Sequence, residues 1–419
     1  MAKPLLFRNR NVALVWTSQT ISQLGDKMFQ IAFFWWILEA GFANDGLLIS
    51  TALVLAVLPA IVFPKLIAKH VGQFSAKKIL TTADSVGFLV AFSLLAIAVQ
   101  SEQNTPILMA GMVSSFFFSL CQAYITPSLN TSLEKMVDSE DMETAVATLG
   151  SVTTMAQLAG ALFGAALVGV LGLQGVIILN GLTFGVSFVL DSMLRAKVET
   201  KNPSEQASPD TANTESKVLP WGKEFPQLKS YVNLFAGVNL FGAPIVVLIP
   251  LYVNKVYGLS SQYLAIAEAG VALGLLGGTI FSKIFPFKDS IYHAVTAILF
   301  TFAALFIVMG FQEIYWLFVF LLIGITFVIG VLNVRMMSYF QVTLKPEQKP
   351  HFFAQLQAKA LVAVPLGYFI IGGAASIIPY NVINILQGVF LSLMAFYALS
   401  NSGKFLSNKQ PTTETKAAA

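Results

Sequence analysis

The chain has 419 residues, of which 56% are hydrophobic and only 11% are charged, and its mean hydropathy is +0.73. Soluble globular domains are about 45–50% apolar and ~25% charged, so this composition excludes a water-soluble protein and indicates an integral membrane protein. The net charge of +4 comes from basic residues spread along the chain, which argues against the clustered basic patch typical of nucleic-acid binding.

Apolar segments long enough to cross a bilayer as helices, about 20 residues each, recur along the whole chain. Two pairs of these segments are separated by very short loops, near Gly172 and near Pro379. We therefore predict an all-α integral membrane protein with twelve transmembrane helices in two six-helix pseudo-repeats. The predicted spans cover residues 12–40, 47–68, 79–99, 106–128, 144–171, 173–194, 227–254, 262–284, 290–311, 314–338, 352–377 and 380–400.

One polar segment divides the chain. Residues 196–226 are rich in Ser, Thr, Pro, Asn and charged side chains, and they cannot bury enough apolar area to order themselves. Segments 127–152 and 333–362 share a plan, a helix end followed by an amphipathic connector and an acid before the next helix, so the two halves resemble each other. We predict an N-terminal six-helix half (1–195), a cytoplasmic linker (196–226), a C-terminal six-helix half (227–401) and a disordered cytoplasmic tail (402–419).

The basic residues predict the orientation. We assume that successive spans cross the membrane in opposite directions and that the N-terminus is cytoplasmic. All of the 25 Lys and Arg residues except Lys27 and Lys255 then lie in cytoplasmic segments. Such asymmetry is the positive-inside signature, and it places both termini in the cytoplasm. We expect a multi-pass monomer in the lipid bilayer of a bacterial inner (cytoplasmic) membrane.

The first span carries a polar face. On a helix, the side chains of this face project within about 100° of one another; they are Gln19, Gln23, Asp26, Lys27 and Gln30. A charge at the bilayer centre costs roughly 2.5–3.5 kcal/mol on insertion scales, so such residues usually face a water-filled path or a partner. We expect this face to line a transport path, while the alternative is that it bonds neighbouring helices. Since adjacent residues do not face each other on a helix, Asp26 and Lys27 each need a partner elsewhere.

Two further acids lie inside predicted spans. From the helical rise, Asp84 lies roughly 8 Å inside the cytoplasmic start of the third span and Glu268 roughly 9 Å inside the outer start of the eighth, so neither shares a level with Asp26. We expect Asp84 to bond helix ends near an inner gate. We expect Glu268 to be either a protonatable group or an outer-gate partner of Lys255. Asp26, Lys27 and Glu268 are the candidates for proton coupling.

The opening of the chain, Leu-Phe-Arg-Asn-Arg at 6–10 followed by Trp16, Gln19 and Gly25-Asp26, resembles that of the macrolide-efflux-type drug exporters of the major facilitator superfamily. This group is related to bacterial lysophospholipid transporters, and the resemblance to the superfamily covers nearly the full chain. One departure lies in the loop 68–78, which keeps a basic pair but lacks the Asp that superfamily members usually carry there. Another is in the fifth span, where Gly160 and Gly164 remain without the usual proline; their spacing lets helices approach closely.

The resemblance implies which residues line the path. In this superfamily the first, fourth, seventh and tenth spans surround a central cavity, which adds Gln122, Tyr124, Asn239 and Asn333 to the polar face of the first span. The inner-gate candidates are Lys77, Lys78, Asp84 and Arg335. No phosphate-binding loop, metal-ligand motif or Cys cluster occurs in the sequence, so we expect no enzyme activity, no cofactor and no metal.

We therefore expect a secondary active transporter that exports a small amphipathic compound by alternating access and uses protons as the coupling ion. One alternative is a flippase for lysophospholipid or another lipid. A second is a non-transporting membrane sensor or partner on the same scaffold, which the altered loop 68–78 would allow.

Overall fold

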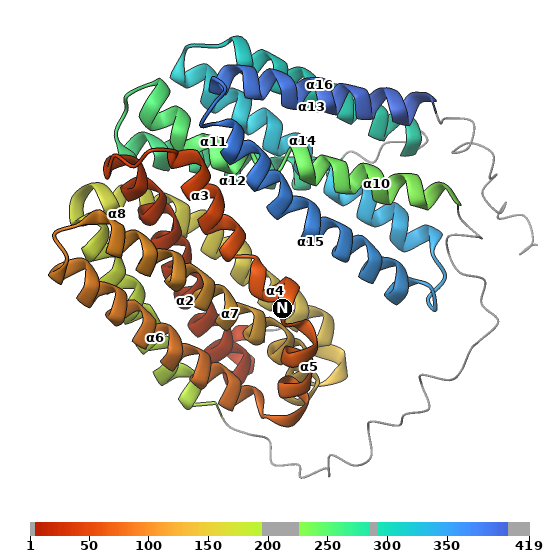
Figure 1. The fold of residues 1–419 in the computed structure, drawn as a ribbon. Coiled ribbons are helices and arrows are strands. Elements are labelled where there is room, and N and C mark those ends of the chain that lie inside the picture. Colours follow the sequence, from red (N-terminus) through yellow and green to blue (C-terminus); the bar gives the residue numbers. More distant parts are fainter. Residues whose placement is uncertain (1–4, 195–225, 285–290, 401–419) are drawn as a thin grey trace, which may run out of the picture. The chain divides into compact units, whose positions relative to one another are not determined.

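The computed structural model describes residues 5–194, 226–284 and 291–400, and every regular element in these ranges is a helix (Figure 1). The predicted tail and all of the predicted linker but Pro226 lie outside the described residues. The elements of the N-terminal part are α1 (Leu5–Arg8), α2 (Arg10–Glu39), α3 (Asp45–Leu55), α4 (Leu58–Val62), α5 (Pro64–Gln73), α6 (Ala76–Gln100), α7 (Asn104–Met136), the 3-10 turn η1 (Ser139–Asp141) and α8 (Met142–Ser192). Those of the C-terminal part are α10 (Pro226–Phe241), α11 (Ile245–Leu251), the π-helical turn η3 (Tyr252–Val256), α12 (Ser261–Ile284), α13 (Ile291–Phe311), α14 (Tyr315–Thr343), α15 (Lys349–Ala374) and α16 (Tyr380–Ser400).

The elements confirm the all-α membrane fold. Within the described ranges, nine helices are long and apolar enough to cross a membrane. The first predicted span, α2, is not among them because its polar face lowers its hydropathy, and the second is divided into short helices. Since α8 covers the fifth and sixth predicted spans together, this set of helices is consistent with twelve spans.

The second predicted span is broken into α3, α4 and α5 by its prolines. Pro59 and Pro64 stand at the first or second positions of α4 and α5, where a missing backbone N–H costs nothing because the first turn leaves such groups unpaired. The hydroxyl of Ser119 on α7 donates to the carbonyl of Ala56, which caps α3. The span therefore bends without leaving this carbonyl unpaired.

Helix α8 changes direction at Gly172. This residue has φ 66° and ψ −179°, a left-handed conformation that glycine adopts without the Cβ strain of other residues. The prediction that one span ends and the next begins near Gly172 is confirmed.

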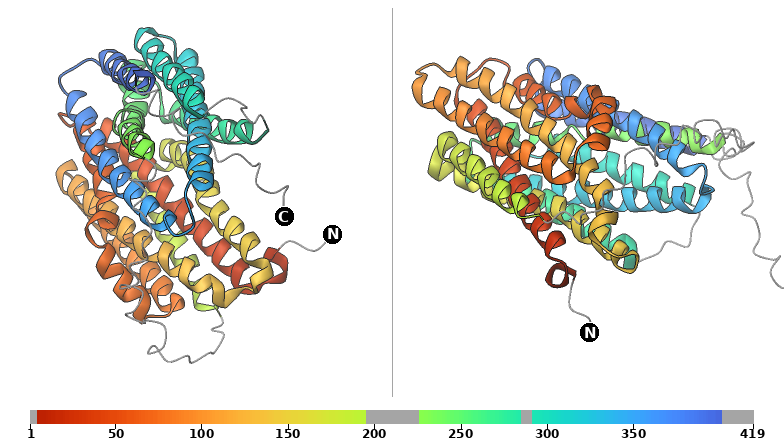
Figure 2. Two further views of the ribbon diagram at one scale, coloured as in Figure 1. Left: turned by 90° about the vertical axis from the view of Figure 1, so that its right-hand side faces the viewer. Right: turned by 90° about the horizontal axis from the view of Figure 1, so that it is seen from below.

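The chain divides into two compact units. Unit 1 comprises residues 1–209, 246–269 and 368–377, and unit 2 comprises residues 210–245, 270–367 and 378–419. Within unit 1, α2 packs along α8, and α6 lies beside both α7 and α8 (Figure 2). Within unit 2, α13 packs against α16 and α14, and α10 packs against α16. The predicted division into two sequence halves differs from these units in two short segments and stays a prediction.

Close contact between α2 and α8 depends on two glycines of α8. A Cβ atom added at Gly160 would lie 2.6 Å from Cβ of Lys27, and one added at Gly164 would lie 2.8 Å from Cα of Met28. Both distances are shorter than real Cβ contacts, so the two backbones approach as closely as they do because these positions lack side chains. The close helix approach predicted for this glycine pair is confirmed, and it positions the part of α2 that carries Asp26 and Lys27.

Candidate functional site

Asp26 lies where α2 meets α7. Its Oδ2 accepts a hydrogen bond from Nε2 of Gln122 at 3.3 Å, and Asn180 of α8 faces the same carboxyl group. The other oxygen, Oδ1, is buried and has no hydrogen-bond partner among the described residues. A carboxyl group with one oxygen left over is available to a proton or to a cationic ligand.

Cavities of unit 1 converge on this carboxyl group. One of about 170 Å³ is lined by Asp26, Gln30 and Gln122 together with the rings of Phe29, Phe34 and Phe118. A second, of about 210 Å³, is lined by Gln23, Asp26, Lys27, Gln30 and Gln122. Gln122 also borders a third cavity of about 480 Å³ between α4, α5 and α7. Four of the five residues on the predicted polar face of the first span therefore border open space.

Lys27 has partners of its own. Its Nζ donates to Oε1 of Gln30 at 2.9 Å, one turn further along α2. Glu268 of α12, a buried residue of unit 1, lies within electrostatic range of Lys27. The expectation that Glu268 does not share a level with Asp26 stays a prediction. Asp26 and Lys27 thus have separate partners, as their adjacency in sequence requires.

An ion pair lies at the predicted outer side of unit 1. Nζ of Lys255, in η3, is 2.8 Å from Oδ2 of Asp45 at the start of α3, and it lies 3.5 Å from the carbonyl of Leu38. Asp45 is buried, with 9% of its side chain exposed, whereas Lys255 keeps 36%. The alternative in which Glu268 pairs with Lys255 is therefore wrong, since Asp45 occupies that position.

A largely apolar cavity of about 320 Å³ lies between α5, α6 and α7, and Tyr124 belongs to it rather than to the Asp26 cavities. The Tyr124 hydroxyl is 2.9 Å from Nδ1 of His70, and the two rings stack with centroids 5.9 Å apart. Gln122 and Tyr124 are two residues apart, so a helix directs them to different faces. The prediction that Tyr124 lines the transport path with Gln122 stays a prediction.

The basic pair of the loop 68–78 has two distinct roles. Lys77 donates to the carbonyls of Ser192 and Leu194 at 2.5 and 3.0 Å, so it caps the C-terminal end of α8, where free carbonyls and the helix dipole favour a cation. Lys78 stands 4.3 Å from the centroid of the Phe74 ring and borders the apolar cavity. The gate assignment of both residues stays a prediction.

Asp84 and Gln19 lie elsewhere than expected. Asp84 is fully buried on α6, and neither carboxyl oxygen bonds a helix end. It lies close enough to Asp191 of α8 to interact with it electrostatically, and Gln19 faces Asp191 as well. The expected bond from Asp84 to helix ends is therefore wrong. Gln19 lies on the predicted face of α2, but it is buried and faces Asp191 of α8, two turns before Asp26.

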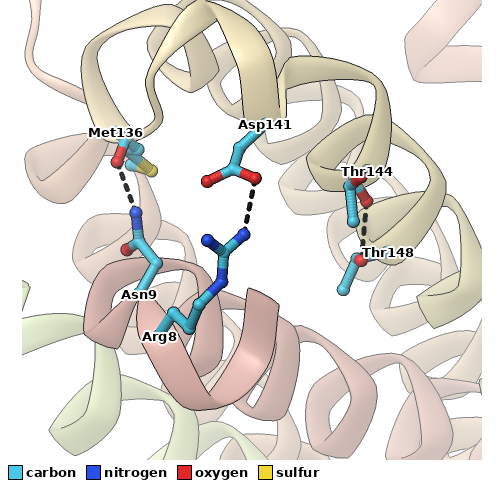
Figure 3. Close-up of polar contacts among 6 residues, drawn as sticks. All are labelled: Arg8, Asn9, Met136, Asp141, Thr144 and Thr148. Atoms are coloured by element: carbon cyan, nitrogen blue, oxygen red, sulfur yellow. Dashed lines mark hydrogen bonds and ion pairs between the residues drawn. The ribbon is translucent and has the colours of Figure 1, made fainter. Parts of the chain in front are cut away.

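The first residues of the chain meet the connector between the fourth and fifth spans (Figure 3). Arg8 donates from Nη2 to Oδ1 of Asp141 at 2.6 Å, and Asn9 donates to the carbonyl of Met136 at 2.6 Å. The side chain of Asn9 also accepts from the N–H of Val12 and caps the N-terminus of α2. The opening motif therefore contacts the acidic connector before the fifth span. These two segments are separate features in the sequence.

The three candidates in unit 2 are dispersed. The Asn239 amide donates to the carbonyl of Phe235, one turn back on its own helix. Arg335 of α14 donates to the carbonyl of Ser282 at the end of α12, at 3.4 Å. Asn333 is exposed. Their assignment to the path and to the inner gate stays a prediction.

Sequence reasoning missed three residues of these sites. Asp191 was inside a predicted span, where an acid is costly, and this was a usable signal. Asp45 was visible only as one acid in a short outer loop. His70 was noted only as a residue near a loop end, and nothing in its neighbourhood along the chain points to Tyr124.

Comparison with known proteins bears on the whole of this architecture. The Major Facilitator Superfamily profile matches residues 15–358. An uncharacterized MFS-type transporter of Bacillus subtilis (strain 168), YkuC, is 20% identical over 383 residues, which is 87% of each chain. A bacterial homolog of the human lysosomal transporter Spinster, in an inward-facing and unoccupied conformation, matches 98% of this chain and 100% of its own, with a TM-score of 0.71 and 14% identity. A bacterial homologue of the iron transporter ferroportin matches 93% of this chain and 98% of its own, with a TM-score of 0.71 and 12% identity. The chain therefore belongs to the Major Facilitator Superfamily and is a multi-pass membrane transporter, not an enzyme.

Proposed function

We propose that the protein is a secondary active exporter of small amphipathic compounds that uses protons as its coupling ion. The single observation that carries this proposal is the position of Asp26, whose carboxyl group borders two cavities and keeps one buried oxygen without a partner in the described chain. We place the protein in a bacterial inner membrane with both termini in the cytoplasm, on the basis of the distribution of Lys and Arg.

The lining of the cavities supports an amphipathic substrate. Carboxyl and amide groups from α2 and α7 stand beside the rings of Phe29, Phe34 and Phe118. Ligand sites of this kind hold an apolar body against aromatic walls and fix its orientation through a few polar groups. Because Lys27 is engaged by Gln30, the free acid at this position favours a substrate with one positively charged end.

Coupling follows from competition for the same carboxyl group. A proton and the positive end of a substrate are alternative occupants of Asp26, so release of one accompanies binding of the other. Exchange of one proton for a singly charged cation moves no net charge, so the pH gradient drives it and supplies about 1.4 kcal/mol, or a tenfold concentration ratio, per pH unit. The resemblance of residues 6–10 to macrolide-efflux-type exporters supports export as the direction.

The test is uptake into proteoliposomes that contain the purified full-length protein and have an acidic interior. We expect tetraphenylphosphonium, an amphipathic cation, to accumulate against its gradient in exchange for protons. Asp26→Asn removes the charge while keeping the size of the side chain, so accumulation should fall to the level of empty liposomes. Asp138→Asn, an exposed acid outside these cavities, is the matched control and should transport like the wild type. Uphill accumulation by a correctly inserted Asp26→Asn variant would overturn the proposal.

A second candidate function is lysophospholipid flipping, which the apolar cavity between α5, α6 and α7 favours. Its walls include Ile79, Val86 and Leu120, while Lys78 and His70 supply basic groups suited to an anionic head group. We expect this activity to move fluorescently labelled lysophosphatidylethanolamine between leaflets without a proton gradient. Lys78→Gln should slow such flipping but leave Asp26-dependent exchange unchanged. Comparison of Lys78→Gln with Asp26→Asn therefore distinguishes the two functions.

A further inference from the structure

Two buried carboxyl groups face each other inside unit 1, away from the cavities that border Asp26. Asp84 comes from α6 and Asp191 from α8, which are packed side by side, and neither residue has any exposed surface. The two groups are close enough to interact electrostatically. Like charges at this depth destabilise each other, so the fold retains this pair only if something positive is held between them.

No basic side chain supplies that charge in the part of the chain that the structure describes. The ion pairs found there join Arg8 to Asp141 and Lys255 to Asp45. Lys77, which meets this end of α8, donates to backbone carbonyls of the helix terminus. From the other packed helices, Asp26 adds a further negative charge, and Cys121 donates its thiol to the carbonyl of Ala83. The pair must therefore be neutralised by a proton or by another small cation.

Oxygen atoms without hydrogen-bond partners surround the pair. Both oxygens of Asp84 and the Oδ2 of Asp191 are buried, and apart from the contact between the two carboxyl groups no donor among the described residues reaches them. Gln19 is only 1% exposed; its amide lies within reach of Asp191, and neither its oxygen nor its nitrogen makes a hydrogen bond of good geometry with a described residue. Ser18 donates to the remaining oxygen of Asp191 at 2.6 Å, and Ser22, one turn along α2, has a buried hydroxyl without a partner among these residues. The set consists of hard oxygen donors from three helices.

We propose that Asp84, Asp191 and Gln19 bind one Na⁺ ion, in competition with a proton. Carboxylate and amide oxygens are the ligands that small hard cations prefer. The neighbouring thiol of Cys121 donates to the carbonyl of Ala83 and is not one of the proposed ligands. Either a proton or a Na⁺ ion leaves the carboxyl pair with the same net charge, so their exchange adds no buried charge. Only the metal ion engages several oxygens at once, including that of Gln19, which a shared proton leaves unpaired.

The site differs from the Asp26 cavities in both position and ligand. Helix α6 contributes Asp84 to this site, whereas the polar groups around Asp26 come from α2, α7 and, through Asn180, α8. A Na⁺ ion held here joins three helices of unit 1. Binding of Na⁺ is measurable without any transport, so failure of the exporter proposal and failure of this one are separate outcomes.

The test uses the purified full-length protein in detergent, with ²²Na⁺ binding and apparent Tm measured in NaCl or in choline chloride at constant ionic strength. We expect saturable binding of one ion, a Tm that is several degrees higher in NaCl, and an apparent Kd that rises as the pH is lowered, approaching about tenfold per pH unit where one proton competes with one ion.

Asp84→Asn and Asp191→Asn keep the size of the side chains, and each should weaken Na⁺ binding at least tenfold. Gln19→Met, which removes only the amide, should weaken it less. Asp45→Asn, a buried acid outside the pair, is the matched control and should keep the wild-type Kd. Equal stability in NaCl and choline chloride, with no ²²Na⁺ bound, would mean that the pair holds a proton alone and would overturn the proposal. Wild-type Na⁺ binding by both Asn variants would overturn it as well.

Discussion

Replacing Gly164 with alanine should push α8 away from α2. The added Cβ would lie 2.8 Å from Cα and 2.9 Å from the carbonyl oxygen of Met28, and these backbone atoms cannot rotate away as a side chain can. Ordinary contact begins at 3.4 Å, so the helices would have to separate by 0.6 Å at this point. Overpacking of this kind costs roughly 1–3 kcal/mol.

The helix preference of alanine acts in the opposite direction and has to be removed from the comparison. Alanine favours a helix over glycine by up to about 1 kcal/mol. Gly150 lies on the same helix, and a Cβ added there would meet no atom within 4 Å. Gly150→Ala therefore has the same gain in helix preference without overpacking. The difference between the two variants therefore isolates the helix contact, and we expect it to be roughly 1–3 kcal/mol.

The assay is the apparent Tm of the purified protein in detergent at a fixed scan rate. For a domain of 150–250 residues, 1 kcal/mol corresponds to roughly 2–4 °C, so Gly164→Ala should melt roughly 2–12 °C below Gly150→Ala. Equal melting of the two variants would refute the reasoning, because it would show that α2 and α8 do not approach each other at Gly164 as described.

Three smaller predictions concern polar contacts of unit 1, each measured as apparent Tm. Asp45→Asn should cost about 1 kcal/mol because Lys255 keeps access to water, and exchanging the two charges should restore stability. Arg8→Gln should change stability by only about 0–1 kcal/mol, since its ion pair with Asp141 is half-exposed; a larger loss would mean that the pair is buried in solution. Tyr124→Phe should cost about 1 kcal/mol by removing the hydroxyl from His70, whereas an unchanged Tm would show that this hydrogen bond does not form.

Hydropathy and charge were sufficient to predict the fold of this chain. The length of the apolar segments and the side on which Lys and Arg lie follow from the cost of placing polar groups in hydrocarbon, a physical constraint that acts on each segment alone. The boundary at Gly172 was predictable for the same reason. The division of the second span at Pro59 and Pro64 followed local proline chemistry that length alone does not reveal.

The site was predictable only in part, because periodicity assigns a residue to a face of its helix but not to the helix that covers that face. Asp26, Gln23 and Gln30 border open space as predicted, whereas Gln19 on the same face is buried against Asp191 of α8. The partners of buried acids come from distant segments. Asp84 lies against Asp191, more than a hundred residues away, and no local pattern encodes that contact.

Proton movement driven by substrate tests the central role of Asp26 most directly. Proteoliposomes that contain the protein and a trapped pH-sensitive dye, with no preset gradient, should show a change in internal pH when tetraphenylphosphonium is added outside. Our account predicts this signal for the wild type and for Asp138→Asn, and its loss in Asp26→Asn. A signal of wild-type size in Asp26→Asn would contradict the account, because protons would then be coupled through a group other than the carboxyl at the centre of the proposed path.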